Sequence, residues 1–358
     1  MKIYDNFTFD LSGTLQPFSF MNFTEVHQGK TCVNSSDLSC LRVSPTGTDA
    51  LLYMCVAAVI FVTVSGNLLV IISICHFKQL HTPTNFILLS LAMADFMVGA
   101  TVMPFYFIEL VDPYWCIGGL NCIMKSVSSF LTYATCVSIY SVVLIAVDRL
   151  FAISNPFLYS TKMTVRLIMR VISIIWLCAL VYNTMLVYCN GSLNYMMGNT
   201  TCVDCTIYMS QEWVTADFFV ILVVPLTTII LIYLKIFAIA KKHANKITCA
   251  RQQQSDSKKC NAMASERKAA KTLSIIVAVF ILCLLPYFIS VVIYVYLSKP
   301  SVYLSLVHSV SILHINSAIN PIIYALFYSW FQKSVKLILT LRICATESSL
   351  MNVLAKET

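Results

Sequence analysis

Two carboxylates in strongly apolar surroundings are the residues of this chain best suited to chemistry. Asp217 lies near the start of WVTADFFVILVVPLTTIILIYLKIF, residues 213–237, and Asp95 lies in LAMADF, residues 91–96. A carboxylate within a membrane is costly, and such residues usually face a polar cavity and mark a functional site. For Asp217 the alternatives are a cationic partner and a structural hydrogen bond to water or to a neighbouring Tyr or Ser.

The histidines provide no recognisable catalytic or metal site. His308 and His314 are six residues apart, which places them on different faces of a helix with about 3.6 residues per turn. No carboxylate lies near them in the sequence, and an enzyme would need a nucleophile–base pair or a metal cluster. We therefore expect that the protein is not an enzyme.

The segments that carry the two carboxylates have the length and composition of membrane helices. The chain has 58% hydrophobic and 11% charged residues, whereas about 25% of the residues of a soluble domain are charged. A helix needs about 20 mainly apolar residues to cross roughly 30 Å of hydrocarbon. We predict an all-α membrane protein, a seven-transmembrane helix bundle with a short amphipathic eighth helix. The seven spans, numbered in chain order, are residues 50–75, 86–110, 122–147, 167–188, 213–239, 272–297 and 303–327.

The distribution of charge predicts the orientation of the bundle. Nineteen of the 24 Lys and Arg residues fall on one side of the spans, and an excess of basic residues marks the cytoplasmic side. The net charge of +8 is therefore attributed to this face and not to nucleic-acid binding. The N-terminus is therefore expected on the outer side. The glycosylation acceptors support this orientation, because all of them fall on that side. These acceptors are Asn6, Asn22, Asn34, Asn190 and Asn199.

The chain divides into three parts by position relative to the membrane. Residues 1–49 are expected to form an extracellular glycosylated N-terminus, residues 50–328 the seven-span domain, and residues 329–358 an amphipathic helix and cytoplasmic tail. The polar and basic run at residues 241–264 predicts a flexible cytoplasmic loop between spans five and six.

Seven spans occur in receptors, retinal proteins and transporters. A retinal protein would need a Schiff-base Lys within span seven, and residues 303–327 contain none. A transporter would have several ionisable residues inside the membrane and often internal repeats, but only Asp95 and Asp217 stand out. These observations favour a receptor.

Short motifs in chain order narrow the class further. They are GNLLV (66–70), LAMADF (91–96), DRL (148–150), Trp176, Pro225, FILCLLP (280–286) and NPIIY (320–324). Together they resemble a rhodopsin-like G-protein-coupled receptor. Four longer segments resemble the trace amine-associated receptors: HFKQLHTPTNF (76–86), ERKAAKTL (266–273), LLPYFI (284–289) and NSAINPIIYALFYSWF (316–331).

The resemblance covers the chain from about Cys32 to Arg342 and implies a function. It implies a plasma-membrane receptor for trace or volatile amines, often in olfactory sensory neurons. The expected partners are a small amine, a stimulatory G protein that raises cAMP, and arrestin. No cofactor is implied apart from an allosteric sodium ion. For that ion the resemblance implies the ligands Asp95, Ser138, Asn316 and Asn320; the alternative is a structural hydrogen bond between Asp95 and Asn67.

The resemblance also implies a switch at the cytoplasmic end. Arg149 is expected to pair with Asp148 and with Glu266 at the base of span six, and release of this pair would free span six to admit a G protein. The alternative is an interfacial Arg that reaches lipid phosphates. Leu150 stands where the family usually has an aromatic residue. The transmission residues implied by position are Ile139, Pro225 and Phe280, with Tyr233 and Tyr324 as inward-swinging tyrosines.

The family's usual amine anchor is missing. Most of its members have an Asp eighteen residues before the Arg of span three, a position held here by Leu131, and residues 114–147 contain no acidic residue. Asp217 lies eight residues before Pro225, about two helical turns toward the outer face. A subset of fish receptors likewise lacks the Asp of span three and has an Asp in span five, and the chain resembles this subset. The resemblance implies that Asp217 binds the ligand ammonium. Because Leu131 removes the strongest amine marker, a receptor of the same architecture for a non-amine ligand is the alternative.

The resemblance implies further pocket residues, which stand at the positions of the family's ligand pocket. Tyr287 and Phe288 would wall the cavity with aromatic faces. His314, where relatives usually have Tyr, would bind the ligand, sense pH or simply pack. Leu284 replaces a Trp of the family, which makes the cavity less aromatic. Phe218, next to Asp217, completes the predicted ligand-contact set.

Seven of the fifteen cysteines lie on the outer side or at its rim, and most of the others lie within the spans. Cys344 follows the amphipathic stretch Ser329–Arg342 and is either a palmitoylation site or an unmodified thiol. The family pattern implies the disulfides Cys122–Cys205 and Cys40–Cys202.

Overall fold

The fold is a bundle of seven membrane-spanning helices. The computed structural model describes the backbone of residues 47–111, 120–189, 211–250, 257–297, 303–344 and 348–354. Within these residues, seven helices are long and apolar enough to cross a membrane, which confirms the predicted fold class. Their membrane-spanning parts are Ala50–His76, Pro83–Phe107, Phe130–Ser154, Val165–Tyr188, Gln211–Ile239, Val277–Tyr296 and Ser305–Phe327.

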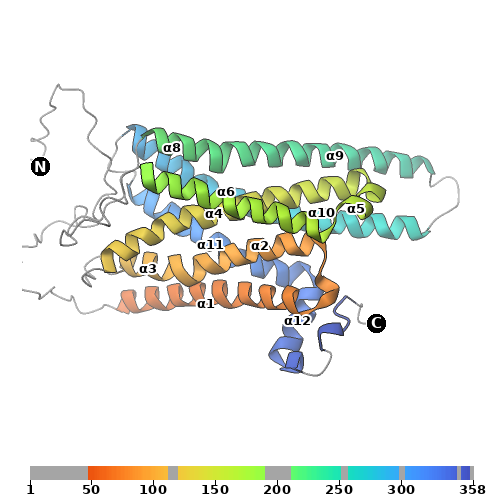
Figure 1. Ribbon diagram of the computed structural model, residues 1–358, viewed down its shortest axis with the longest axis horizontal. Helices are drawn as coiled ribbons and strands as arrows, with labels where there is room; N and C mark the ends of the chain where they lie inside the picture. The colour runs from red at the N-terminus through yellow and green to blue at the C-terminus, as the bar shows by residue number, and fades with distance from the viewer. Residues whose placement is uncertain are drawn as a thin grey trace, which may run out of the picture.

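The helices run side by side along the long axis of the molecule (Figure 1). Spans one, three, four, six and seven are the single helices α1 (Gly47–His76), α4 (Leu120–Ser154), α6 (Val165–Cys189), α10 (Ser257–Leu297) and α11 (Tyr303–Phe327). Span two consists of α2 (Pro83–Met97), η3 (Val98–Val102) and α3 (Met103–Val111). Span five consists of α8 (Gln211–Asp217), η4 (Phe218–Val223) and α9 (Val224–Ala250). The short elements are η2 (Lys78–Leu80), α5 (Pro156–Lys162), α12 (Ser329–Leu339), η6 (Arg342–Cys344) and η7 (Ser348–Leu350).

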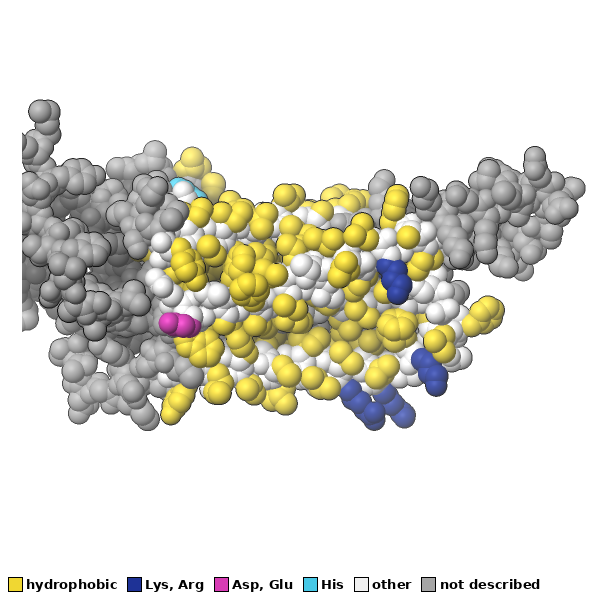
Figure 2. Space-filling model, turned by 90° about the horizontal axis from the view of Figure 1, so that it is seen from above, with side chains coloured by type: hydrophobic (Ala, Val, Ile, Leu, Met, Phe, Trp, Pro, Cys, Tyr) yellow, Lys and Arg dark blue, Asp and Glu magenta, His cyan; other side chains and the backbone are white. Residues whose placement is uncertain are grey.

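The outside of the bundle is apolar along its length. Phe61 is 71% exposed, and Leu231 and Leu326 are 66% and 67% exposed, as expected of side chains that face lipid. Hydrophobic side chains cover the middle of the molecule in Figure 2, and Lys and Arg gather at one end. We call this end, which carries η2, α5 and α12, the basic end.

Prolines explain two interruptions of the helical hydrogen bonding. The π-helical segments η3 and η4 each end two residues before a proline, Pro104 and Pro225. A proline cannot donate to the carbonyl four residues earlier, and its ring clashes with that carbonyl. Each of these carbonyls lies inside the π segment, whose wider turn accommodates the defect. Span five is therefore irregular immediately after Asp217.

The predicted loop at residues 241–264 is wrong. The helix α9 continues to Ala250 and α10 begins at Ser257, so both helices extend well beyond the apolar part of their spans. Lys and Ala, which are frequent in this run, are good helix formers, and a helix that leaves the membrane needs no apolar face. Polarity alone did not distinguish a solvated helix from a loop.

Helices α1 and α11 pack in close contact at Gly66. A Cβ atom placed on Gly66 would lie 2.7 Å from Cβ of Pro321, and the proline ring cannot rotate away. We expect Gly66→Val to push the two helices apart, at a cost of about 1–3 kcal/mol for overpacking. Cell-surface receptor, measured with an N-terminal epitope tag, should fall several-fold. Leu68→Val on the same helix, at a side chain that is 40% exposed, is the control; normal surface levels of the Gly66 variant would contradict the packing.

Candidate functional site

The carboxylate of Asp217 lies inside the bundle. It ends α8, immediately before η4, and its Oδ1 accepts a hydrogen bond of 3.0 Å from the hydroxyl of Tyr182 on α6. Asp217 is also within electrostatic range of Cys136 on α4 and of Tyr287 on α10. Groups from spans three, four and six thus surround this side chain of span five. It faces its neighbouring helices and not the lipid.

Three aromatic rings join spans five and six. The ring centroids of Phe218 and Phe288 are 6.3 Å apart, and those of Tyr287 and Phe288 are 5.2 Å apart, both edge to face. Phe288 is 3% exposed and belongs to the main core, against which Tyr287 and Phe218 pack. The sequence predicted these three residues as ligand contacts. The structure brings the three rings together, and Tyr287 is within electrostatic range of Asp217.

A hydrogen bond from span three stabilises the irregular turn of η4. The Val224 N–H donates to the Phe219 carbonyl and leaves the Val220 carbonyl, its normal helical partner, free. The hydroxyl of Tyr140 on α4 donates to this carbonyl at 3.0 Å. Buried carbonyls need a partner, and Tyr140 provides one. The turn that carries Asp217 is therefore tied to α4.

Of the other predicted pocket residues, His314 and Leu131 lie at spans two, three and seven, whereas Leu284 lies on α10 with Tyr287 and Phe288. His314 of α11 is fully buried; its Nδ1 is 2.8 Å from the Val310 carbonyl, and its ring lies 4.6 Å from that of Tyr106 in span two. Leu131 packs against both core clusters. Leu284 is 4% exposed within the main core. The predicted ligand set thus divides into a group at spans five and six and a group at spans two, three and seven.

Asp95 is the centre of a polar cluster in the middle of the bundle. Its carboxylate, fully buried, accepts hydrogen bonds from Asn320 Nδ2 at 2.7 Å, Ser317 Oγ at 2.9 Å and Ser138 Oγ at 3.5 Å. Asn67 donates instead to the carbonyls of Thr63 and Ser317. The alternative Asp95–Asn67 pair is therefore not formed in this structure.

Ser317 was missed by the sequence analysis. It lies three residues before Asn320 and hence on the same face of α11, a spacing that could have revealed it.

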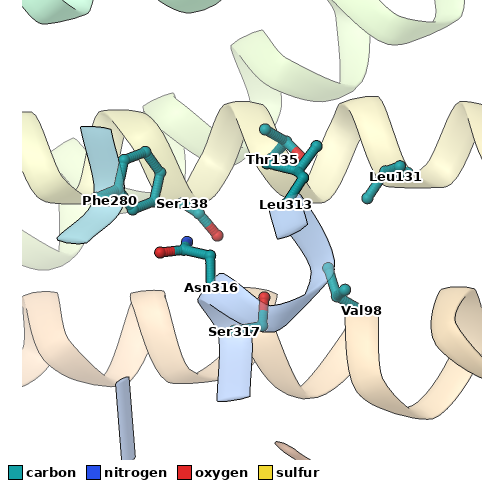
Figure 3. A pocket seen from close by; sticks show the side chains of 8 residues that line it. All are labelled: Val98, Leu131, Thr135, Ser138, Phe280, Leu313, Asn316 and Ser317. Atoms are coloured by element: carbon teal, nitrogen blue, oxygen red, sulfur yellow. The ribbon is translucent and has the colours of Figure 1, made fainter. Parts of the chain in front are cut away.

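A small cavity adjoins this cluster. Its volume is about 10 Å³, roughly that required by one water molecule. Ser138 of α4 points toward Asn316 of α11 across it (Figure 3). Asn316 Oδ1 is buried and has no hydrogen-bond partner among the residues that the structure describes. A group of oxygen ligands around a small cavity fits a hard cation such as sodium. The cavity is lined by Val98, Leu131, Thr135, Ser138, Phe280, Leu313, Asn316 and Ser317.

A second buried carboxylate, Asp148, organises the basic end. Its side chain is fully buried and accepts hydrogen bonds of 2.8 Å from Thr84 Oγ1 and from the Tyr159 hydroxyl. Arg149 forms an ion pair with Asp148 and also donates to the Thr84 hydroxyl. Burial holds the pKa of Tyr159 above its ordinary value, so this hydroxyl stays protonated and donates at neutral pH. Thr84 and Tyr159, which the sequence analysis did not single out, therefore help to hold Arg149 in place.

The predicted transmission residues lie between these clusters. Ile139 and Phe280 are 1% and 3% exposed in the main core, and Pro225 is buried at the start of α9. Tyr324 is fully buried, with its ring centroid 5.9 Å from that of Tyr328. Tyr233 packs against the same core.

Several predicted residues lie outside the described residues or have side chains outside them. The positions are Glu266, the disulfide cysteines Cys40, Cys122, Cys202 and Cys205, the glycosylation acceptors Asn6, Asn22, Asn34, Asn190 and Asn199, and Cys344. The structure adds nothing to these predictions.

Comparison with known proteins identifies the family. Residues 66–324 match the family model of the 7 transmembrane receptor (rhodopsin family). Trace amine-associated receptor 13c of Danio rerio is 38% identical over 92% of this chain and 97% of its own length. Trace amine-associated receptor 7a of Rattus norvegicus is 39% identical over 98% of this chain and 99% of its own length. Trace amine-associated receptor 9 of Homo sapiens is 38% identical over 94% of this chain and 98% of its own length. The chain is a trace amine-associated receptor of the rhodopsin family.

Membership of the trace amine-associated receptors determines the class of activity. The protein is a multi-pass receptor of the plasma membrane and not an enzyme. Its partners are a small-molecule ligand and a G protein. The cluster of Asp148 and Arg149 at one end of the receptor, Asp217 and the rings of Phe218, Tyr287 and Phe288 all belong to the matched region.

Proposed function

We propose that this receptor binds a small amine through Asp217 and signals through a stimulatory G protein that raises cAMP. The observation that carries the proposal is a carboxylate inside the bundle whose partner is neutral. Among the described residues, Asp217 forms no ion pair, and Tyr182 is its one hydrogen-bond donor. The names of the relatives, which are trace amine-associated receptors, support an amine as the ligand.

An ammonium group would offset the cost of burying this carboxylate. Placing an Asp at the centre of a membrane costs about 2.5–3.5 kcal/mol, and the cost is smaller for Asp217, seven residues into its span. A cation at about 4 Å, in an effective dielectric of about 20, contributes roughly 4 kcal/mol. The adjacent rings of Phe218, Tyr287 and Phe288 would add cation–π attraction of about 0.5–2 kcal/mol. The ligand orientation is then that of the fish subset, with the ammonium against span five.

One observation favours a second candidate, a receptor of the same architecture for a non-amine ligand. Leu131 is apolar at the position of the family's usual Asp, and it lines the cavity beside Asn316 and Ser317. The polar side chains of this cavity could hydrogen-bond a neutral ligand, although the cavity would have to widen because its volume is about 10 Å³. His314 would contribute to the same region, whereas Asp217 would then be held by Tyr182 alone.

A cAMP assay of the expressed receptor separates the two candidates. A panel of primary to quaternary amines is tested beside neutral analogues in which the nitrogen is replaced by carbon or a hydroxyl group. Amines are expected to raise cAMP in receptor-expressing cells and not in mock-transfected cells. Activation by the neutral analogues alone would favour the second candidate.

The orientation of the receptor follows from its charge. The basic end carries Lys78, Lys162, Arg166, Lys333 and Lys336, and the positive-inside rule places such an end in the cytoplasm. Arg149 would then face the G protein, and arrestin would meet the same surface. The N-terminus is extracellular in this arrangement. Olfactory sensory neurons are the proposed site of expression.

Asp95 is the proposed sodium ligand, together with Ser138, Ser317, Asn316 and Asn320. Replacing external sodium by potassium, a larger cation that is not an amine, is expected to shift the amine concentration–response curve of the receptor about fivefold or more. Asp95→Asn removes the charge that holds the ion, so its curve should be the same in both buffers. A sodium-dependent shift that persists in Asp95→Asn would place the ion elsewhere.

A further inference from the structure

The hydroxyl of Tyr182 and the carboxylate of Asp217 lie next to each other between α6 and α8. Tyr182 lies on α6 and Asp217 at the end of α8, which lie next to each other at the end of the bundle away from the basic end (Figure 1). The hydroxyl donates its single proton to Oδ1 of Asp217 at 3.0 Å. Sequence analysis expected a Tyr or Ser as a merely structural alternative to a ligand, but the two roles are compatible.

Counting donors and acceptors shows what this pair of groups lacks. A tyrosine hydroxyl has one donor and two acceptor lone pairs, and an ionised carboxylate only accepts. The one proton of Tyr182 is used on Oδ1, and Oδ2 of Asp217 receives no donor from the described residues. Two oxygen atoms, Asp217 Oδ2 and Tyr182 Oη, are therefore left with accepting capacity and no donors of their own.

Among the described residues, no other group donates to these two oxygens. Phe218 and Phe288 are apolar, Cys136 is a weak donor that is 5% exposed in the main core, and the Tyr287 hydroxyl lies near Asp217 without a hydrogen bond to it. A single charged nitrogen that satisfies both oxygens needs two N–H bonds. Protonated primary and secondary amines have three and two such bonds, a protonated tertiary amine has one, and a quaternary ammonium has none.

We propose that Tyr182 is a specificity-determining residue that makes this receptor select primary and secondary amines over tertiary and quaternary ones. It fixes Oδ1 of Asp217, leaves Oδ2 for one N–H of the ammonium, and accepts a second N–H at its own oxygen. This inference rests on the proposed function, because it presupposes that the ammonium meets Asp217.

The test uses one carbon skeleton with zero to three N-methyl groups. Concentration–response curves for cAMP are recorded for wild type and Tyr182→Phe at matched surface levels. One charge-assisted hydrogen bond corresponds to about tenfold or more in affinity, so wild type should prefer the primary to the tertiary amine by at least that factor. Tyr182→Phe should reduce this preference about tenfold, mainly through a weaker response to the primary amine.

Two further variants make the result decisive. Tyr188→Phe, on the same helix at a side chain that is 68% exposed, should leave every curve unchanged. If Tyr182→Phe does not reach the surface, Tyr182→Leu replaces it, and the same loss of preference is expected.

An equal weakening of all four ligands, or an unchanged preference, would overturn the role of Tyr182. Asp217→Asn, measured beside it, distinguishes this failure from a failure of the proposed function. If Asp217→Asn raises the half-maximal amine concentration about 100-fold while Tyr182→Phe leaves the preference intact, only the selectivity inference fails. If Asp217→Asn leaves the potency of the amines unchanged, the proposed amine site itself is wrong.

Discussion

Asp217→Asn is expected to raise the amine concentration needed for half-maximal cAMP production at least about 100-fold. Asparagine has nearly the shape of aspartate and keeps an oxygen that accepts from Tyr182, so the substitution removes the charge and little else. The lost attraction is of the order of 3–4 kcal/mol, and each 1.4 kcal/mol corresponds to about tenfold. The maximum response at saturating amine should be retained.

Two variants control for effects other than charge. Asp217→Glu keeps the charge on a longer side chain and should lose less potency than Asp217→Asn. Glu212→Gln removes a carboxylate from an exposed position of the same helix and should leave the response as it is. Equal losses in Asp217→Glu and Asp217→Asn would mean that packing, and not charge, is what matters at this position.

Asp148→Asn is expected to raise cAMP in the absence of ligand. The carboxylate of Asp148 is fully buried and holds Arg149, with Thr84 and Tyr159 as its other donors. Hydrogen bonds to a charged group contribute about 1.5–3 kcal/mol, so their loss would shift the equilibrium toward a free Arg149 by roughly tenfold or more. A free guanidinium at the proposed cytoplasmic end is available to a G protein. Basal cAMP per surface receptor is the measurement.

The neighbouring donors allow a graded control. Thr84→Val and Tyr159→Phe each remove one hydrogen bond from Asp148 and keep its charge, so smaller increases in basal cAMP are expected. Arg149→Ala should abolish signalling, because the group released by the other variants is then absent. Unchanged basal cAMP in Asp148→Asn at normal surface levels would show that the cluster does not restrain the receptor.

Much of the fold could be predicted from the sequence because the membrane imposes simple requirements. A span needs an apolar run of sufficient length, and all seven predicted spans are confirmed. The ends were harder to predict. The helix α4 continues to Ser154, beyond the predicted end at residue 147, and α9 continues to Ala250. Outside the membrane, helices need no apolar pattern, so hydropathy does not mark where they stop.

The polar partners were harder to predict than the charged groups themselves. Asp217 and Asp95 stand out in the sequence because a carboxylate is rare in an apolar span, and Asp148 was found through the DRL motif. Tyr182 and Thr84 do not, since a Tyr or Thr in a membrane helix is ordinary and its importance depends on which helix lies beside it. That information is in the packing of α6 against α8 and of α2 against α4.

The π segment η4 had a partial signal in the sequence. Pro225 indicates that the carbonyl of Ile221 loses its helical donor, but not how the chain responds. The structure resolves the defect by a wider turn that begins immediately after Asp217 and is held by Tyr140. The direction of the Asp217 side chain depends on this turn and could not be obtained from helical periodicity alone.

The most direct test of an anionic site in span five is a double-mutant-type cycle. The charge is removed from the receptor, from the ligand, or from both. An activating amine and its neutral isostere, with the ammonium replaced by a methyl or hydroxyl group, are titrated on wild type and on Asp217→Asn. We predict that wild type prefers the amine by at least about 100-fold and that Asp217→Asn responds to both ligands with similar potency. If Asp217→Asn still prefers the amine over its neutral isostere by the same factor as wild type, the proposed anionic site is wrong.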